Sequence, residues 1–170
     1  MPKYERDFLP VLLFLSCCLL SILIPGGPIE TRNFSHISLV VLGAFNTFLT
    51  TLGMLSILLI YFIFHGRVWA FLLAILCGLG YFLVYALDLL KIFPVSPDPM
   101  PYALYIIEML GLIVSIPLML YAGKGFYAGE NSQENIKKIA YSNNFILVAV
   151  FLTLASIGII VFATNAAMSK

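Results

Sequence analysis

The stretch YFLVYALDLLKIFPVSPDPMPYALYIIE, Tyr81–Glu108, is the most informative part of the sequence for the architecture of the chain. It contains the end of one apolar segment, a proline-rich connection and the beginning of the next apolar segment. Three charged residues, Asp88, Lys91 and Glu108, interrupt or border these segments. A charge in the hydrocarbon layer costs at least about 2.5–3.5 kcal/mol on insertion scales, so such residues are candidates for a function. The stretch therefore predicts two antiparallel membrane helices with a candidate site between them.

The composition of the whole chain places it in a lipid bilayer. Of its 170 residues, 62% are hydrophobic and 10% are charged, and the mean hydropathy is +1.05. Soluble domains carry roughly 25% charged residues and could not bury so much apolar surface. The net charge of +1 and the lack of a basic run give no indication of nucleic-acid binding. We expect an integral membrane protein of a bacterial inner membrane or an equivalent membrane, with the bilayer as its main partner.

Five apolar segments predict an all-α, polytopic membrane bundle that forms one domain over residues 1–170. The predicted spans are 8–24, 37–64, 68–93, 102–121 and 145–163, with a long polar loop over 123–144. The first segment resembles a signal peptide, whose cleavage would leave four spans, but no small-x-small site precedes Pro25. With the N-terminus inside, six Lys and Arg residues fall on the inner side and three on the outer side. The N-terminus and the 123–144 loop are therefore predicted to be cytoplasmic.

Polar residues on three of the predicted helices are spaced to share helix faces. Residues three and four positions apart lie on one face of a helix, which groups Tyr81, Tyr85 and Asp88 on one span and Tyr105 with Glu108 on the next. Asp88 and Glu108 both lie about 9–10 Å from the connection between their helices, at 1.5 Å per residue. We predict an outward-facing pocket with these two carboxylates as its floor and Lys91 compensating one of them. The predicted ligand-binding residues are Asn46, Tyr81, Tyr85, Asp88, Lys91, Tyr105 and Glu108, with Tyr102 as a further wall of the pocket.

Several functions are compatible with this pattern. The pocket suits a cationic or polyhydroxylated small molecule, or a proton, because two neighbouring carboxylates cannot both ionise cheaply. The chain would then bind or help to transport a solute or ion, as an oligomer or within a larger complex. Alternatively, Asp88 pairs with Lys91 near the headgroups and Glu108 only joins helices, as in an accessory or scaffold subunit. An intramembrane enzyme with Asp88 and Glu108 as acid and base is the third hypothesis, although no nucleophile motif accompanies them.

The remaining reactive side chains indicate neither a cofactor nor a metal site. Cys17, Cys18 and Cys77 lie in apolar segments without a C-x-x-C pair, as is typical of cysteines that pack as small hydrophobic residues. His36 and His65 stand at opposite ends of the second predicted span, so they cannot share a metal ion. We therefore predict no cofactor, no metal ion and no catalytic residue.

Overall fold

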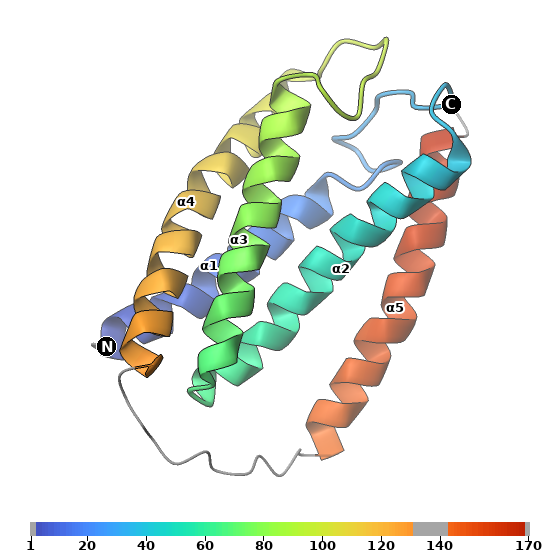
Figure 1. Cartoon of the computed structure of the whole chain (residues 1–170). Coiled ribbons are helices and arrows are strands. Elements are labelled where there is room, and N and C mark those ends of the chain that lie inside the picture. Colours follow the sequence, from blue (N-terminus) through green and yellow to red (C-terminus); the bar gives the residue numbers. More distant parts are fainter. Residues whose placement is uncertain (1–2, 131–142, 169–170) are drawn as a thin grey trace.

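The computed structural model describes residues 3–130 and 143–168, and within them it is all-helical (Figure 1). The helices are α1 (Lys3–Ile22), α2 (Leu39–Phe64), α3 (Val68–Leu89), α4 (Tyr102–Glu130) and α5 (Asn143–Met168). This confirms the predicted class, an all-α bundle of five helices.

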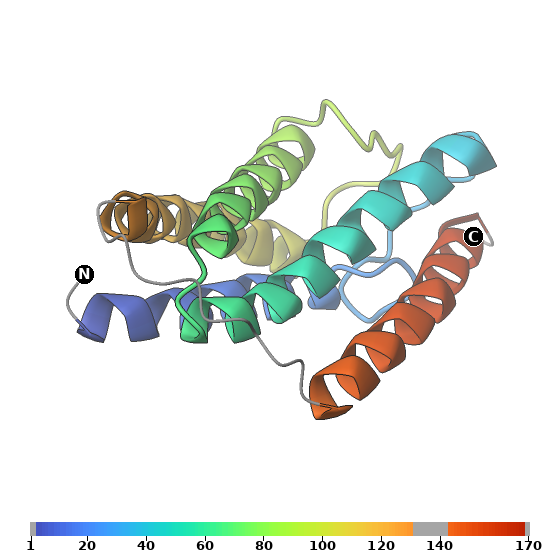
Figure 2. The same cartoon turned by 60° about the horizontal axis from the view of Figure 1, so that its bottom comes forward.

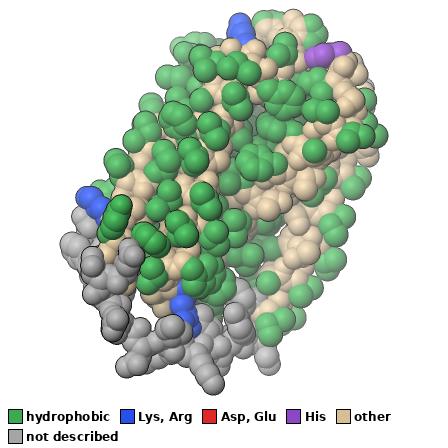
Figure 3. Space-filling model, in the orientation of Figure 1, with side chains coloured by type: hydrophobic (Ala, Val, Ile, Leu, Met, Phe, Trp, Pro, Cys, Tyr) green, Lys and Arg blue, Asp and Glu red, His purple; other side chains and the backbone are tan. Residues whose placement is uncertain are grey.

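Four of these helices, α2 to α5, are long and apolar enough to cross a membrane. The apolar part of α1, Phe8–Ile22, is shorter, about 22 Å at 1.5 Å per residue against a hydrocarbon core of ~30 Å. Hydrophobic side chains cover the face of the molecule in Figure 3, and Lys and Arg side chains lie toward its ends. The chain is therefore a multi-pass membrane protein.

Short local signals set three of the helix boundaries. Ser38 caps the start of α2 by accepting a hydrogen bond from the Val41 amide at 3.3 Å. Gly66 adopts a positive φ of 69° in the turn to α3, a conformation that glycine takes without steric cost. Lys91 has a φ of 56°, which ends the run of helical backbone just after α3.

Helix α4 is longer than predicted. It continues to Glu130, so the first part of the predicted loop 123–144 is helical, and residues 131–142 lie outside the described residues. Two glycines in this extension pack against α3. A methyl group at Gly125 would lie 2.5 Å from Phe71 Cε1, and one at Gly129 would lie 2.8 Å from Val68 Cγ2. Close packing against α3 therefore outweighs the low helix propensity of these glycines.

The helices form one bundle with a peripheral member. Helices α3 and α4 pack along each other, α1 packs on both α2 and α4, and α5 packs mainly on α2. Figures 1 and 2 show α5 on the far side of α2 from α3 and α4. We call "upper end" the end in Figure 1 that carries the 23–38 and 90–101 connections and the last turns of α5. The lower end carries the start of α1, the turn between α2 and α3, and the end of α4.

Candidate functional site

Four charged side chains are buried together near the upper end. Arg32 donates from Nε to Glu30 Oε1 at 3.0 Å and from Nη2 to Glu30 Oε2 at 2.6 Å. It also donates from Nη1 to Asp88 Oδ1 at 2.8 Å and from Nη2 to Asp88 Oδ2 at 2.7 Å. Exposed fractions are between 1% and 8% for all four residues, Glu30, Arg32, Asp88 and Glu108. We call these four residues the carboxylate cluster.

Glu108 is the member of the cluster that Arg32 does not satisfy. Nη2 of a guanidinium carries two hydrogens, and here both are donated, one to Glu30 and one to Asp88. The same Nη2 is 3.9 Å from Glu108 Oε1, too far for a hydrogen bond. Glu108 Oε2 is buried and has no hydrogen-bond partner among the described residues. Asp88 and Glu108 face the same guanidinium nitrogen, with Asp88 Oδ2 2.7 Å and Glu108 Oε1 3.9 Å from Nη2, but two ionised carboxylates have no proton to donate to each other.

Two connections hold Arg32 in place. The Asn33 amide donates to Asp98 Oδ2 at 2.8 Å, and the Ser96 hydroxyl donates to the Asn33 carbonyl at 2.9 Å. The 23–38 and 90–101 connections are therefore fastened to each other directly beside Arg32. Burial lowers the pKa of Arg32, but its hydrogen bonds and charge interactions with Asp88 and Glu30 outweigh burial and raise the pKa above its usual range. Arg32 is thus a fixed positive charge.

The structure overturns the predicted pairing of Lys91 with Asp88. Lys91 is exposed, and Asp88 has both carboxylate oxygens occupied by Arg32. Helix α3 ends at Leu89, and the positive φ of Lys91 takes the backbone off the helical path. The Lys91 amide still closes a turn on the Asp88 carbonyl at 2.8 Å, but its left-handed backbone leaves the side chain exposed instead of paired with Asp88.

The predicted tyrosines separate into a buried and an exposed pair. Tyr81 and Tyr85 are buried on the same face of α3 as Asp88, and their rings stack with centroids 6.4 Å apart. The Tyr81 hydroxyl is 2.9 Å from Ser56 Oγ. The Tyr85 hydroxyl has no hydrogen-bond partner among the described residues. It lies near enough to Glu108 for the two groups to interact electrostatically.

Tyr102 and Tyr105 do not wall the site. They are 80% and 45% exposed, on the outer surface of α4. The buried face of α4 instead runs through Leu104, Glu108 and Ser115. The prediction that Tyr105 and Glu108 share the inward face of this helix was wrong. The residue that shares the buried face with Glu108 is Leu104, four positions before it.

A small cavity adjoins the cluster. It has a volume of about 50 Å³, and its lining includes all four cluster residues and Asn46. Water occupies about 30 Å³ in the liquid, whereas pockets for small organic ligands hold about 300–1,000 Å³. The cavity therefore has room for one or two water molecules or a small ion. The polyhydroxylated solute that the sequence allowed does not fit.

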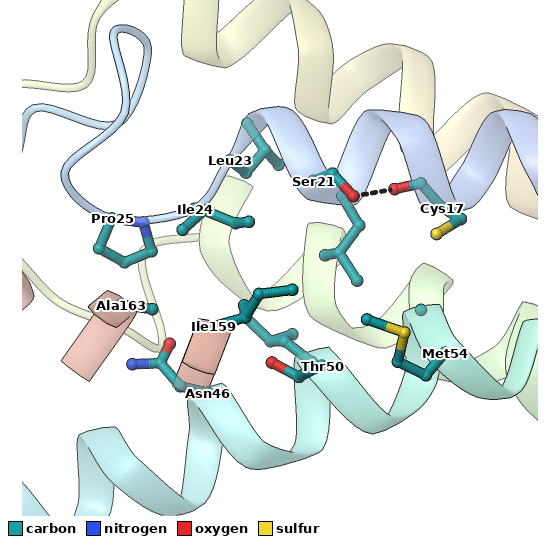
Figure 4. A pocket seen from close by; sticks show the side chains of 13 residues that line it. Cys17, Ser21, Leu23, Ile24, Pro25, Asn46, Thr50, Met54, Ile159 and Ala163 are labelled. Carbon is teal, nitrogen blue, oxygen red and sulfur yellow. Dashed lines mark hydrogen bonds between the residues drawn. The ribbon is translucent and has the colours of Figure 1, made fainter. Parts of the chain in front are cut away.

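Asn46 also lines a second cavity, of about 60 Å³, between α1, α2 and α5 (Figure 4). Its wall is mostly apolar, and none of its lining residues is charged. The Ser21 hydroxyl in that wall donates to the Cys17 carbonyl at 2.8 Å. Asn46 itself donates to Thr164 Oγ1 on α5 at 3.1 Å. Its described hydrogen bond therefore joins helices, and the carboxylate cluster remains the candidate site.

Sequence reasoning missed Glu30 and Arg32. Both lie in a short connection next to prolines and glycines, where such charges are normally solvated. Arg32 is one of the three Lys and Arg residues predicted on the outer side. Two opposite charges in a connection between apolar segments are a weak signal. No local pattern indicates that this loop enters the bundle.

Fold and site together define a class: a multi-pass membrane protein with a buried cluster of carboxylates around one arginine. Residues 5–139 match the family described as a domain of unknown function (DUF8051), so the chain belongs to that family. The matched range contains the whole cluster and ends before α5. No curated protein and no solved structure gave a significant match.

Proposed function

We propose that this protein binds a small cation at the carboxylate cluster, as a step in moving or sensing that cation at the membrane. The observation that carries the proposal is the imbalance of charge and hydrogen bonding at Glu108. Three buried carboxyl groups surround one guanidinium, and the third, Glu108, has a buried oxygen without a donor. An unpaired buried charge is expensive, and a bound cation would remove that cost.

Each residue of the cluster has a separate role in this proposal. Arg32 holds Glu30 and Asp88 by paired hydrogen bonds, so these two carboxylates form a rigid frame. Glu108 supplies the unoccupied oxygen, and the adjoining cavity of about 50 Å³ supplies room for one small occupant. Glu30 and Arg32 belong to the 23–38 connection at the upper end, so a cation would reach the cluster from that end.

Thermal unfolding of the purified protein in detergent or nanodiscs tests this function. The unfolding midpoint is measured over a range of Li⁺, Na⁺, K⁺ and Ca²⁺ concentrations and of pH. A ligand that binds only the folded state raises the midpoint with concentration. We expect at least one of these cations, H⁺ included, to do so, and Glu108→Gln to fold but lose that response.

Lys91→Gln is the control. Lys91 is an exposed charge at the same end of the bundle, outside the carboxylate cluster and its hydrogen bonds, and its removal should leave the cation response in place. A response that is the same in Glu108→Gln as in the wild type would refute the proposed site.

The second candidate function is that of an accessory subunit in a larger membrane complex. The observation that favours it is the exposure of α5. Only 6% of the most apolar 18-residue stretch of α5 is buried within the molecule. Its long apolar side chains are exposed, among them Leu147, Phe151 and Leu154. Native mass spectrometry of the protein released gently from its own membrane tests this alternative. A partner subunit of defined stoichiometry, lost when α5 is removed, would favour it, whereas a chain that carries only lipid would count against it.

A further inference from the structure

We propose that the occupant of the site is a proton shared by the carboxyl groups of Asp88 and Glu108, and that it enters and leaves only from the upper end. This inference rests on the proposed function and names its ligand.

The geometry of the two carboxyl groups supports a shared proton. Asp88 Oδ2 and Glu108 Oε1 face the same nitrogen, Arg32 Nη2, at 2.7 and 3.9 Å, and both residues line one cavity. Arg32 already donates to both oxygens of Asp88. A carboxylate has about four lone-pair positions, so Asp88 can accept a further hydrogen bond. One proton on Glu108, donated to Asp88, would give Glu108 a partner and remove one negative charge from the cluster. It would do so without a larger cavity.

The surroundings favour a proton over a metal ion. No group of three or more His, Cys, Asp or Glu side chains within residues 3–130 and 143–168 is arranged to hold a metal ion. The guanidinium of Arg32 lies between the carboxylates of Glu30 and Asp88, where a metal ion would otherwise bind. The titratable groups that face the shared position are Glu30 and Arg32 from the first connection, Tyr85 from α3, and the two carboxyls themselves.

Tyr85 is the further residue that this inference assigns to the site. Its hydroxyl is buried, without a described hydrogen-bond partner, and interacts electrostatically with Glu108. Its ring is held against α4, since a methyl group at Gly111 would lie 2.5 Å from Tyr85 Cζ. Gly111 is one helical turn from Glu108, so the Tyr85 hydroxyl and Glu108 Oε2 are unpartnered buried oxygens at neighbouring turns of α4. Such a pair is a usual setting for an internal water molecule. We therefore assign Tyr85 as a hydrogen-bonding partner of the protonated Glu108, directly or through one water.

Access from one end follows from the distribution of buried side chains. Below the Tyr81–Ser56 hydrogen bond, the core that α1 to α4 form toward the lower end is apolar. Its buried members are Leu9, Leu13, Leu59, Ile63, Ala70, Phe71, Ala74, Leu118 and Ala122. Among the described residues, no buried charged side chain lies in this lower part. A proton at Glu108 therefore meets no buried charged side chain among the described residues on the way to the lower end.

Infrared spectroscopy of the protein in lipid bilayers, in H₂O and in D₂O, tests the shared proton. A protonated carboxyl group has a C=O stretch above the amide band, and this stretch moves down in D₂O. We expect such a band at neutral pH, its loss in Glu108→Gln and a changed frequency in Tyr85→Phe. The exposed tyrosine of the same helix as Glu108 provides the control, and Tyr105→Phe should leave the band unchanged.

A pH titration shows in which direction loss of the proton changes the unfolding midpoint. As the pH rises the proton leaves, so the band should disappear and the unfolding midpoint should fall over the same pH interval. In Glu108→Gln the midpoint should not change over that interval. A wild-type spectrum without the band, or a band that persists in Glu108→Gln, would overturn the proton assignment. Tyr85→Phe with an unchanged band frequency would overturn the role of Tyr85.

The same measurements distinguish a bound proton from a bound metal cation. A midpoint that responds to a metal cation, with no carboxyl band, would keep the cation site and overturn the proton. No response to any cation or to pH, again with no band, would overturn both. Proton flux into liposomes, followed with a trapped pH-sensitive dye, tests the access. We expect flux no faster than in protein-free liposomes, and a faster flux that Glu108→Gln abolishes would refute access from one end.

Discussion

Arg32 and Asp88 are 56 positions apart in the chain and form a two-pronged ion pair, with Nη1–Oδ1 and Nη2–Oδ2 distances of 2.8 and 2.7 Å. The planar guanidinium matches both oxygens of a carboxylate, which makes this one of the stronger kinds of hydrogen-bonded pair. The pair joins the first connection of the chain to the last turn of α3. It therefore organises the upper end of the bundle and leaves Glu108 as the unsatisfied group.

Replacing Arg32 should destabilise the protein more than replacing most single residues. Arg32→Ala removes the cation from a cluster of three buried carboxyls, and breaking a buried pair in this way costs roughly 3–5 kcal/mol. Arg32→Lys keeps the charge but not the planar, two-pronged guanidinium, so its loss of unfolding free energy should be intermediate. The free energy of unfolding in mixed micelles, measured by denaturant titration, gives both values. Equal stability of the Lys variant and the wild type would show that the fork geometry is unimportant.

Asp88 and Lys91 should respond differently to substitution. Asp88→Asn leaves Arg32 without its second carboxylate and should lower the free energy of unfolding by a few kcal/mol, about the cost of breaking a buried pair. Lys91→Ala, at an exposed position, should change stability little. A double-mutant cycle of Arg32 with Asp88 should show strong coupling, and the same cycle of Lys91 with Asp88 should show none. Coupling between Lys91 and Asp88 would restore the ion pair that the sequence suggested.

Gly111 should tolerate no side chain. A methyl group there meets the ring of Tyr85, and overpacking of this kind typically costs about 1–3 kcal/mol. Gly111→Ala should therefore lower the unfolding midpoint, and it should also change the carboxyl band because Tyr85 must move. Gly123→Ala is the control on the same helix, with nothing within 4 Å of the added methyl group. That variant should be neutral or slightly more stable, because alanine is the better helix former.

The hydrogen bond from Asn46 to Thr164 should hold α5 on α2. The buried hydroxyl of Thr164 accepts it at 3.1 Å, and side-chain hydrogen bonds between membrane helices contribute about 0.6 kcal/mol on average and up to about 1.7. Thr164→Val should broaden the distance distribution between spin labels on α2 and α5. Thr153→Val is the control, because the exposed Thr153 hydroxyl donates within its own helix to Ala149 at 2.8 Å. Equal broadening in both variants would exclude a specific role for Thr164.

Hydropathy sufficed to locate the helices because each long apolar segment must satisfy its backbone polar groups internally in a bilayer. Helical spacing also placed Tyr81, Tyr85 and Asp88 on one buried face. The same reasoning placed Tyr105 incorrectly. In a helix that is apolar on all sides, nothing in the local sequence distinguishes the face toward the lipid from the face toward the protein. The packing of α4 on α3 and α1 makes that choice.

Apolar length is enough to predict the class of this protein and its five helices from the sequence alone. The partner of Asp88, in contrast, is visible only in the folded chain. Arg32 reaches it from a connection without periodicity, and hydrogen bonds to the 90–101 connection hold it there. A contact across 56 residues depends on how the chain folds back on itself. The resulting excess of carboxyl groups over cations, on which the proposed proton site depends, is therefore a property of the folded bundle.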